Sequence, residues 1–87
     1  MVALRATLKT IHVQYFALLR EQRGLTRETL VTTAATAAAL YDELRARHPF
    51  TLAAEHLRVA VNDEFAPWTA PLRDGDSLVF IPPVAGG

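Results

Sequence analysis

A short segment near the end of the chain is apolar on both sides of an extended backbone, and it restricts the fold more than any other feature. This segment is Ser77–Ile81, and its apolar side chains divide between the two sides as Leu78 with Phe80 and Val79 with Ile81. A strand with two apolar faces is typical of the interior of a sheet that includes parallel pairing. Pro82 and Pro83 then end the strand, because proline has no N–H to donate. We therefore expect a sheet with its last strand in the centre.

The rest of the chain supplies the partners of that strand. Alternating apolar patterns and turn signals predict strands over 11–18, 27–32, 57–61, a short segment around Phe65, and 77–81. A run of helix-forming residues predicts one amphipathic helix, capped by Thr36 and ending near Arg47, before Pro49. The reversal between the first two strands is expected at Gly24. This order is α+β and fits a β-grasp fold: a mixed sheet of four to five strands, with one main helix packed across one face and the first and last strands parallel in the middle.

The length allows a single folded domain. The chain has 87 residues, of which 51% are hydrophobic and 21% are charged, as in an ordinary globular domain. We expect an N-terminal extension over 1–10, a β-grasp domain over 11–82, and a flexible C-terminal tail over 83–87.

Composition argues against several classes of partner and compartment. Nine basic and nine acidic residues give no net charge, so neither nucleic acid nor an anionic membrane surface is an expected partner. No apolar stretch is long enough to span a bilayer, and the first ten residues lack the pattern of a secretory signal, so we expect a cytoplasmic protein. The chain has no cysteine, which excludes a disulfide, a thiolate nucleophile and a side-chain persulfide.

No catalytic or metal-binding pattern is present in the sequence. The three histidines are dispersed, and no pair has the spacing of metal ligands; they are His12, His48 and His56. The sequence Asp74-Gly75-Asp76 predicts a turn and not a calcium loop, because the later ligand positions are Leu78 and Phe80. Phosphate-binding loops and nucleophile elbows are absent. We therefore expect no metal site, no bound cofactor and no enzymatic activity of the chain on its own.

The C-terminal sequence is the most informative for function. Gly86 and Gly87 have no side chains, so they offer a narrow tip with an unhindered α-carboxylate. From Pro83 onward the tail could extend about 15 to 18 Å at ~3.3 to 3.6 Å per residue, which is enough to enter another protein's active site. A stiff Pro-Pro base with a slim Gly-Gly tip suits a covalent carrier, because the partner must bind the body while it acts on the tip.

These features together resemble one family. The sequence combines the β-grasp pattern with four short motifs: Arg20-Glu21 with Gly24, Val61-Asn62, Leu72-x-Asp74-Gly75-Asp76, and the ending Phe80-Ile81-Pro82-Pro83-Val84-x-Gly86-Gly87. Over about Ile11 to Gly87 it resembles the family of molybdopterin synthase small subunits, which are ubiquitin-like sulfur carriers of the MoaD/ThiS type. The chain departs from the family pattern in its N-terminal extension and in Ile81, where an aromatic residue is common.

The resemblance implies a role for the terminal residue. In this family the C-terminal glycine, here Gly87, is adenylated by a ubiquitin-activating-like adenylyltransferase that uses ATP and Mg, and a sulfur donor system then converts it to a thiocarboxylate. The tail enters the active site of the large synthase subunit and donates sulfur to cyclic pyranopterin monophosphate. The residues expected to insert are Pro82, Pro83, Val84, Ala85 and Gly86. The family further implies a heterotetramer of two large and two small subunits.

Strand phase suggests where partners dock. If the residues alternating with Ile11 and Val13 face the helix, then Phe16, Val79 and Ile81 emerge on the opposite face, and Phe65 can join them. The family has apolar contacts at positions that match Phe16, Phe65 and Ile81. We therefore expect the partner interface at Phe16, Phe65, Val79 and Ile81.

Three alternatives remain open. The chain could carry sulfur in another pathway, such as thiamine thiazole synthesis, although the Pro-Pro-Val ending favours the molybdenum cofactor. It could be a ubiquitin-like protein modifier or an interaction module without a sulfur-carrying role. A small enzyme is the least supported, because the sequence has no nucleophile, metal or acid–base cluster.

Overall fold

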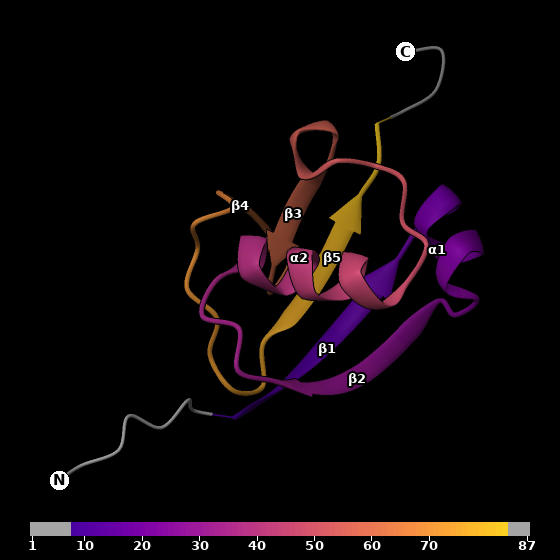
Figure 1. Cartoon of the computed structure of the whole chain (residues 1–87). Helices are drawn as coiled ribbons and strands as arrows, with labels where there is room; N and C mark the ends of the chain where they lie inside the picture. Colours follow the sequence, from indigo (N-terminus) through magenta and orange to yellow (C-terminus); the bar gives the residue numbers. More distant parts are fainter. Residues whose placement is uncertain (1–7, 84–87) are drawn as a thin grey trace, which may run out of the picture.

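A five-stranded mixed sheet, crossed on one face by a helix, forms the body of the protein (Figure 1). The computed structural model describes residues 8–83. The elements, in chain order, are β1 (Lys9–Tyr15), α1 (Ala17–Arg23), β2 (Arg27–Thr32), α2 (Ala37–Arg47), the short 3₁₀ helix η1 (Ala54–His56), β3 (Arg58–Val61), β4 (Glu64–Ala66) and β5 (Ser77–Ile81). None of the helices within residues 8–83 is long and apolar enough to cross a membrane.

The sheet has the strand order β2-β1-β5-β3-β4. The first strand, β1, pairs in parallel with the last strand, β5, and every other pairing is antiparallel. β5 is hydrogen-bonded on both sides, to β1 and to β3. The predicted α+β class, the β-grasp order and the central position of the last strand are therefore confirmed.

The main helix, α2, forms where the sequence predicts it. The Thr36 hydroxyl accepts a hydrogen bond from the Ala39 N–H at 3.1 Å, and this bond satisfies one of the free donors of the first turn. The helix ends at Arg47, directly before His48 and Pro49. Its buried face packs on the sheet and consists of Ala37, Leu40, Tyr41 and Leu44.

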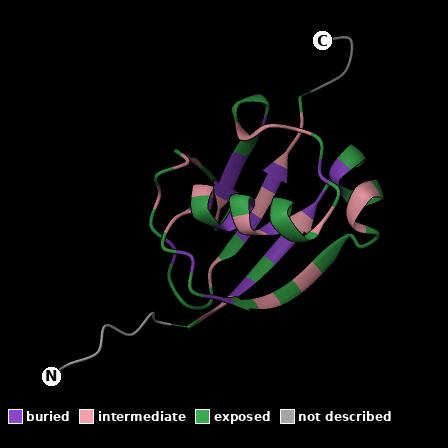
Figure 2. Cartoon of the chain, viewed as in Figure 1, coloured by how far each residue is buried: buried purple, intermediate pink, exposed green. Residues whose placement is uncertain are grey.

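The core lies between α2 and one face of the sheet (Figure 2). Aromatic rings fill its centre, with centroid separations of 5.2 to 6.4 Å among Tyr15, Tyr41, Phe50, Trp68 and Phe80. The aliphatic part of the core includes Ile11, Val13, Leu19, Leu40, Val59 and Leu78. The strand residues of the core alternate along their strands and therefore point to the same face of the sheet. The helices cover that face, and the opposite face remains open.

The first strand and the segment after it differ from the sequence expectation. The sequence predicts a strand over 11–18 with a turn after it, but β1 covers Lys9–Tyr15 and residues 17–23 form α1. The segment is rich in helix formers, and as a helix it buries Leu19 completely. Gly24 then ends α1 in the left-handed conformation, with φ 82°, and its N–H donates to the Arg20 carbonyl at 2.8 Å.

The predicted terminal segments fall largely outside the part of the chain that the structure describes. Of the predicted extension over 1–10, residues 1–7 are outside it, and Lys9 and Thr10 belong to β1. Of the predicted tail over 83–87, only Pro83 is described.

Candidate functional site

The site begins where β5 leaves the sheet. The last pairs of β5 join Phe80 to Tyr15 of β1 and Ile81 to Arg58 of β3, so the strand is held on both sides up to its end. Pro82 is half-buried and Pro83 is exposed. The other predicted residues of the tail, which are Val84, Ala85, Gly86 and Gly87, lie outside the described residues.

The open face of the sheet places the four predicted interface residues together. One row of cross-strand neighbours runs over all five strands and consists of Arg27, Gln14, Val79, Ala60 and Phe65. The next row, nearer the tail, places Arg58 beside Ile81. Phe16 continues β1 in an extended conformation, which puts it at the register position beside Ile81.

The apolar members of these two rows form an apolar patch, which consists of Phe16, Ala60, Phe65, Val79 and Ile81. Phe65 is 69% exposed and Phe16 is 40% exposed, while Val79 and Ile81 are half-buried. The register thus places Phe16, Phe65, Val79 and Ile81 on the face opposite α2, and their role as a partner interface stays a prediction. Such a patch on a small domain is suited to contact with another protein.

A hollow joins the apolar patch to the base of the tail. It is lined by Glu55, His56, Leu57, Arg58, Phe65, Ile81, Pro82 and Pro83. A partner that covered the apolar patch would therefore also touch the point where the chain leaves the sheet.

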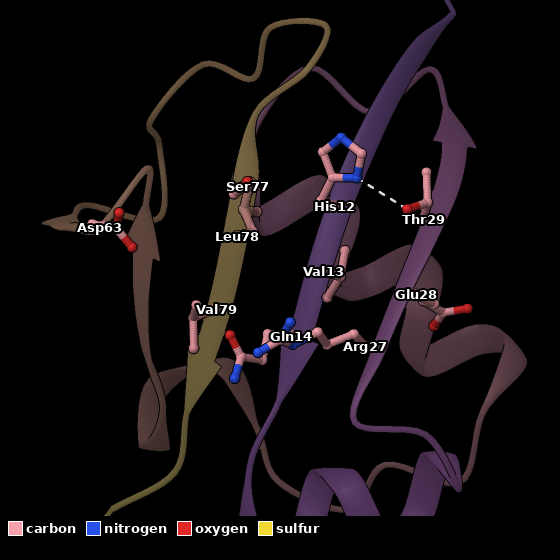
Figure 3. Close-up of a pocket in the computed structure, with 10 residues that line it drawn as sticks. All are labelled: His12, Val13, Gln14, Arg27, Glu28, Thr29, Asp63, Ser77, Leu78 and Val79. Atoms are coloured by element: carbon pink, nitrogen blue, oxygen red, sulfur yellow. Dashed lines mark hydrogen bonds between the residues drawn. The ribbon is translucent and has the colours of Figure 1, made fainter.

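The other half of the open face is polar and hollowed (Figure 3). The His12 ring nitrogen Nδ1 and the Thr29 hydroxyl lie 3.0 Å apart in a hydrogen bond, and Gln14 and Arg27 lie nearer the tail. The rest of the lining is Val13, Glu28, Asp63, Ser77, Leu78 and Val79. Within residues 8–83 no three His, Asp or Glu side chains gather as metal ligands would.

At the opposite end of the sheet, motif residues hold two turns together. Asn62 and Asp63 form the tight β3–β4 turn with positive φ values of 51° and 70°. The Asn62 amide donates to the Asp76 carboxylate at 2.9 Å, and its carbonyl oxygen accepts from the Ser77 N–H at 3.0 Å. The Asp74 carboxylate accepts from the Thr10 N–H at 2.6 Å. These residues, which the sequence analysis treated as motif and turn positions, fix the register of β1, β3 and β5.

A partly buried charge network lies near the tail end of the sheet, and no sequence pattern predicts it. The Tyr15 hydroxyl donates to Glu28 at 2.6 Å, and Arg23 donates to both oxygens of the same carboxylate, at 2.9 and 2.8 Å. The hydrogen bonds from Arg23 are the main reason that the pKa of Glu28 is lowered. Burial, followed by the bond to Glu28, raises the pKa of Tyr15. The network ties α1 to β2, and no spacing rule in the sequence would have paired Arg23 with Glu28 across the turn.

His48 lies beside this network and on the edge of the core. Its ring centroid is 5.7 Å from that of Phe50. Burial, and then the nearby Arg23 charge, lower the pKa of His48. The neutral imidazole is therefore favoured at this position.

The sequence matches one protein family and several characterised relatives over most of its length. The model of the ThiS family matches residues 13–87. The molybdopterin synthase sulfur carrier subunit of Escherichia coli is 36% identical over 80 residues, which cover 88% of this chain and 99% of that protein. The protein of the same name from Mycobacterium tuberculosis is 35% identical over 80 residues, covering 88% of this chain and 96% of that one.

Solved structures agree with the fold. SAMP1 from Haloferax volcanii, a small archaeal modifier protein, superposes with a TM-score of 0.72 at 29% identity, covering 90% of this chain and 99% of the other. In the complex of subunits 1 and 2 of the molybdopterin-converting factor from Helicobacter pylori, the matching chain gives a TM-score of 0.61 at 25% identity, covering 90% of this chain and 99% of that one. The fold is thus of the ubiquitin-like β-grasp type. The chain belongs to the ThiS family, and over most of its length it is similar to the sulfur carrier subunits of molybdopterin synthase.

Proposed function

We propose that this protein is the sulfur carrier subunit of a molybdopterin synthase and that the α-carboxylate of Gly87 carries the sulfur. One observation carries the proposal: the family match runs through residue 87, and relatives at about 35% identity over 88% of the chain are molybdopterin synthase sulfur carrier subunits. The rigid exit of β5 and the apolar patch beside it support the proposal, because a carrier must be held by its body while its tip reacts.

The proposed chemistry takes place in two steps. A carboxylate oxygen of Gly87 attacks the α-phosphorus of ATP on a ubiquitin-activating-like adenylyltransferase that uses Mg, and pyrophosphate leaves. A hydrosulfide equivalent from the donor system, with sulfur at the sulfide level, then attacks the acyl carbon, a C–S bond forms, and AMP leaves with the original oxygen. The product is a thiocarboxylate, and hydrolysis after sulfur transfer returns the carboxylate.

The proposed acceptor is cyclic pyranopterin monophosphate in the active site of the large subunit. In this scheme Pro82, Pro83, Val84, Ala85 and Gly86 would thread into that site, and the catalytic side chains would come from the large subunit. The H. pylori complex of subunits 1 and 2 supports a two-subunit assembly, which we propose to be a cytoplasmic heterotetramer.

The direct test is the intact mass of the chain after incubation with ATP, Mg, the cognate adenylyltransferase and a sulfur source. We expect a gain equal to the exchange of one oxygen atom for one sulfur atom. A variant without Gly87 is the control and is expected to show no gain, because its terminal carboxylate lies one residue short of the reactive position. An unchanged mass, with an adenylyltransferase that works on another carrier, would contradict the proposal.

A second candidate function is protein modification. The likeness to SAMP1, at a TM-score of 0.72, favours it, because the name of that protein describes a modifier. The same incubation, followed by mass analysis of a lysate to which the activated chain is added, separates the two. A modifier would be recovered in an amide bond to lysine, whereas a sulfur carrier would be recovered as the thiocarboxylate or the free acid.

A further inference from the structure

The strand positions of the open face carry positive charge, although the whole chain has no net charge and Asp63 of the β3–β4 turn lies at the edge of this face. Two arginines lie on it, Arg27 on β2 and Arg58 on β3. The carboxylates of the neighbouring strands are on the opposite side, because Glu28 pairs with the core residue Val13, and Glu64 pairs with Val61. The strand positions of this face, within residues 8–83, therefore include no acidic side chain.

Arg58 occupies an unusual place on this face, because it stands within the apolar patch. Its cross-strand neighbour is Ile81, and its guanidinium carbon lies 5.7 Å from the centre of the Phe65 ring. Arg58 is exposed and makes no salt bridge with any residue from 8 to 83, although Glu55 lines the same hollow. Any partner that covers the patch must also cover this charge.

We propose that Arg58 selects the docking partner by pairing with a carboxylate that the partner brings into the centre of an otherwise apolar contact. The occupant is the large subunit of the synthase, so the inference rests on the function proposed above. The partner surface is required to present an apolar area with one Asp or Glu facing Arg58.

Three physical arguments favour a pair at this position. Burying a guanidinium without a partner is costly, so a surface that lacks the acid is rejected. Arginine is weakly hydrated and binds a carboxylate through two parallel hydrogen bonds, which suits a buried contact. The Phe65 ring also holds the guanidinium in place before docking, so less side-chain entropy is lost on binding.

The direction of the affinity change caused by one substitution separates this proposal from a purely apolar contact. Arg58→Leu removes the charge and adds apolar area to the patch. If the contact were only apolar, the variant would bind the large subunit at least as tightly as the wild type does. If Arg58 meets a carboxylate, the variant leaves that carboxylate buried and unpaired, and the dissociation constant rises by at least about 30-fold, which corresponds to about 2 kcal/mol.

Arg27→Leu is the matched control. Arg27 has the same charge on the same face, but it lies on β2, three strands from β3 and thus about 14 Å away at the usual strand spacing. It lies outside the apolar patch, so its effect is that of a rim charge. We expect a change in affinity of less than about threefold, and one that disappears at high salt.

The measurement is isothermal titration calorimetry of the full chain, wild type and variants, with the purified cognate large subunit. A partner scan, in which each exposed Asp or Glu of the large subunit is changed to its amide, should find one position whose loss adds nothing in the Arg58→Leu background. Equal or tighter binding of Arg58→Leu overturns the inference and leaves the proposed function standing. No binding by the wild type overturns both.

Discussion

The side chain of Glu28 shows how one residue joins three parts of the molecule. Its carboxylate accepts hydrogen bonds from Tyr15 on β1 and from Arg23 at the end of α1, while its own backbone belongs to β2. The Glu28 side chain is 16% exposed and that of Arg23 is 23% exposed, so the pair is only partly screened by water. The network therefore stabilises the contact between the helix and the edge of the sheet.

A pH-dependent loss of stability is expected from this network. The pKa of Glu28 is lowered in the folded state, so its contribution is present above the ordinary glutamate value of 4.5 and is lost as the pH falls through the folded value. Glu28→Gln should lower the free energy of unfolding at pH 7 by about 1 to 2 kcal/mol. Urea denaturation at a series of pH values should show this difference shrink toward zero below about pH 4.

Glu21→Gln is the control for that measurement. Glu21 is exposed on α1, the helix that also carries Arg23, and makes no salt bridge with any described residue. We expect a change within about 0.5 kcal/mol. If the difference between wild type and Glu28→Gln were constant from pH 7 to pH 3, the carboxylate would not be the source of the stabilisation.

At the scale of single residues, the sequence predicts the sheet face of a side chain better than it predicts the residue that the side chain contacts. The alternation along 77–81 correctly places Val79 and Ile81 on the face opposite Leu78 and Phe80, because the pleat of a strand leaves no other choice. It does not predict that Arg58 stands over Phe65 or that Arg23 reaches Glu28. These contacts depend on which strands become neighbours, and that information is not local.

The element that the sequence analysis missed, α1, is small but firmly attached. It covers only Ala17–Arg23, too few residues to be stable as an isolated helix, so its stability must come from packing. Leu19 supplies that packing, because it is completely buried, while its neighbour Leu18 is 40% exposed. A strand pattern from Ile11 to Tyr15 runs directly into this segment, so the boundary could be found only from the helix propensity of residues 17–23.

The two adjacent leucines give a direct test of α1. Leu19→Ala should reduce the free energy of unfolding by about 2 to 4 kcal/mol, because it leaves a cavity where the helix meets the core. Leu18→Ala should change it by less than about 1 kcal/mol, since that side chain is partly in water already. Thermal unfolding followed by circular dichroism measures both. An effect of Leu18→Ala as large as that of Leu19→Ala would contradict the role of Leu19 as the residue that anchors α1 in the core.

At the scale of the whole molecule, we propose that the open face and the tail act together in binding a partner. The apolar patch lies on the strands next to the exit of β5, and the hollow lined by Pro82 and Pro83 connects the two. The sequence predicts this arrangement because the segment Ser77–Ile81 indicates both a central last strand and which of its side chains lie on the open face. It does not predict the hollow or the polar half of the face, both of which depend on how loops and edge strands close around the sheet.

Substitutions on the open face should separate binding from folding. Ile81→Asp and Phe16→Asp should each weaken binding to the large subunit by at least about 100-fold, because a charge is forced into an apolar contact. Val31→Asp is the control, since Val31 is 58% exposed on the same face but lies on β2, away from the apolar patch. Titration calorimetry measures affinity, and circular dichroism checks the fold. Binding that survives both patch substitutions would place the interface elsewhere.

The parallel pairing of the first and last strands also has a mechanical consequence. A partner that grips the tail pulls β5 along its own axis, and β5 is bonded to β1 on one side and to β3 on the other. A pull in that direction loads the hydrogen bonds of both ladders at once, in shear, and cannot open them one by one as it would a hairpin pulled apart from its ends. If the proposed function holds, a force applied at the tail during insertion and release would be shared by both ladders of β5, which favours a body that stays folded through repeated rounds of sulfur loading.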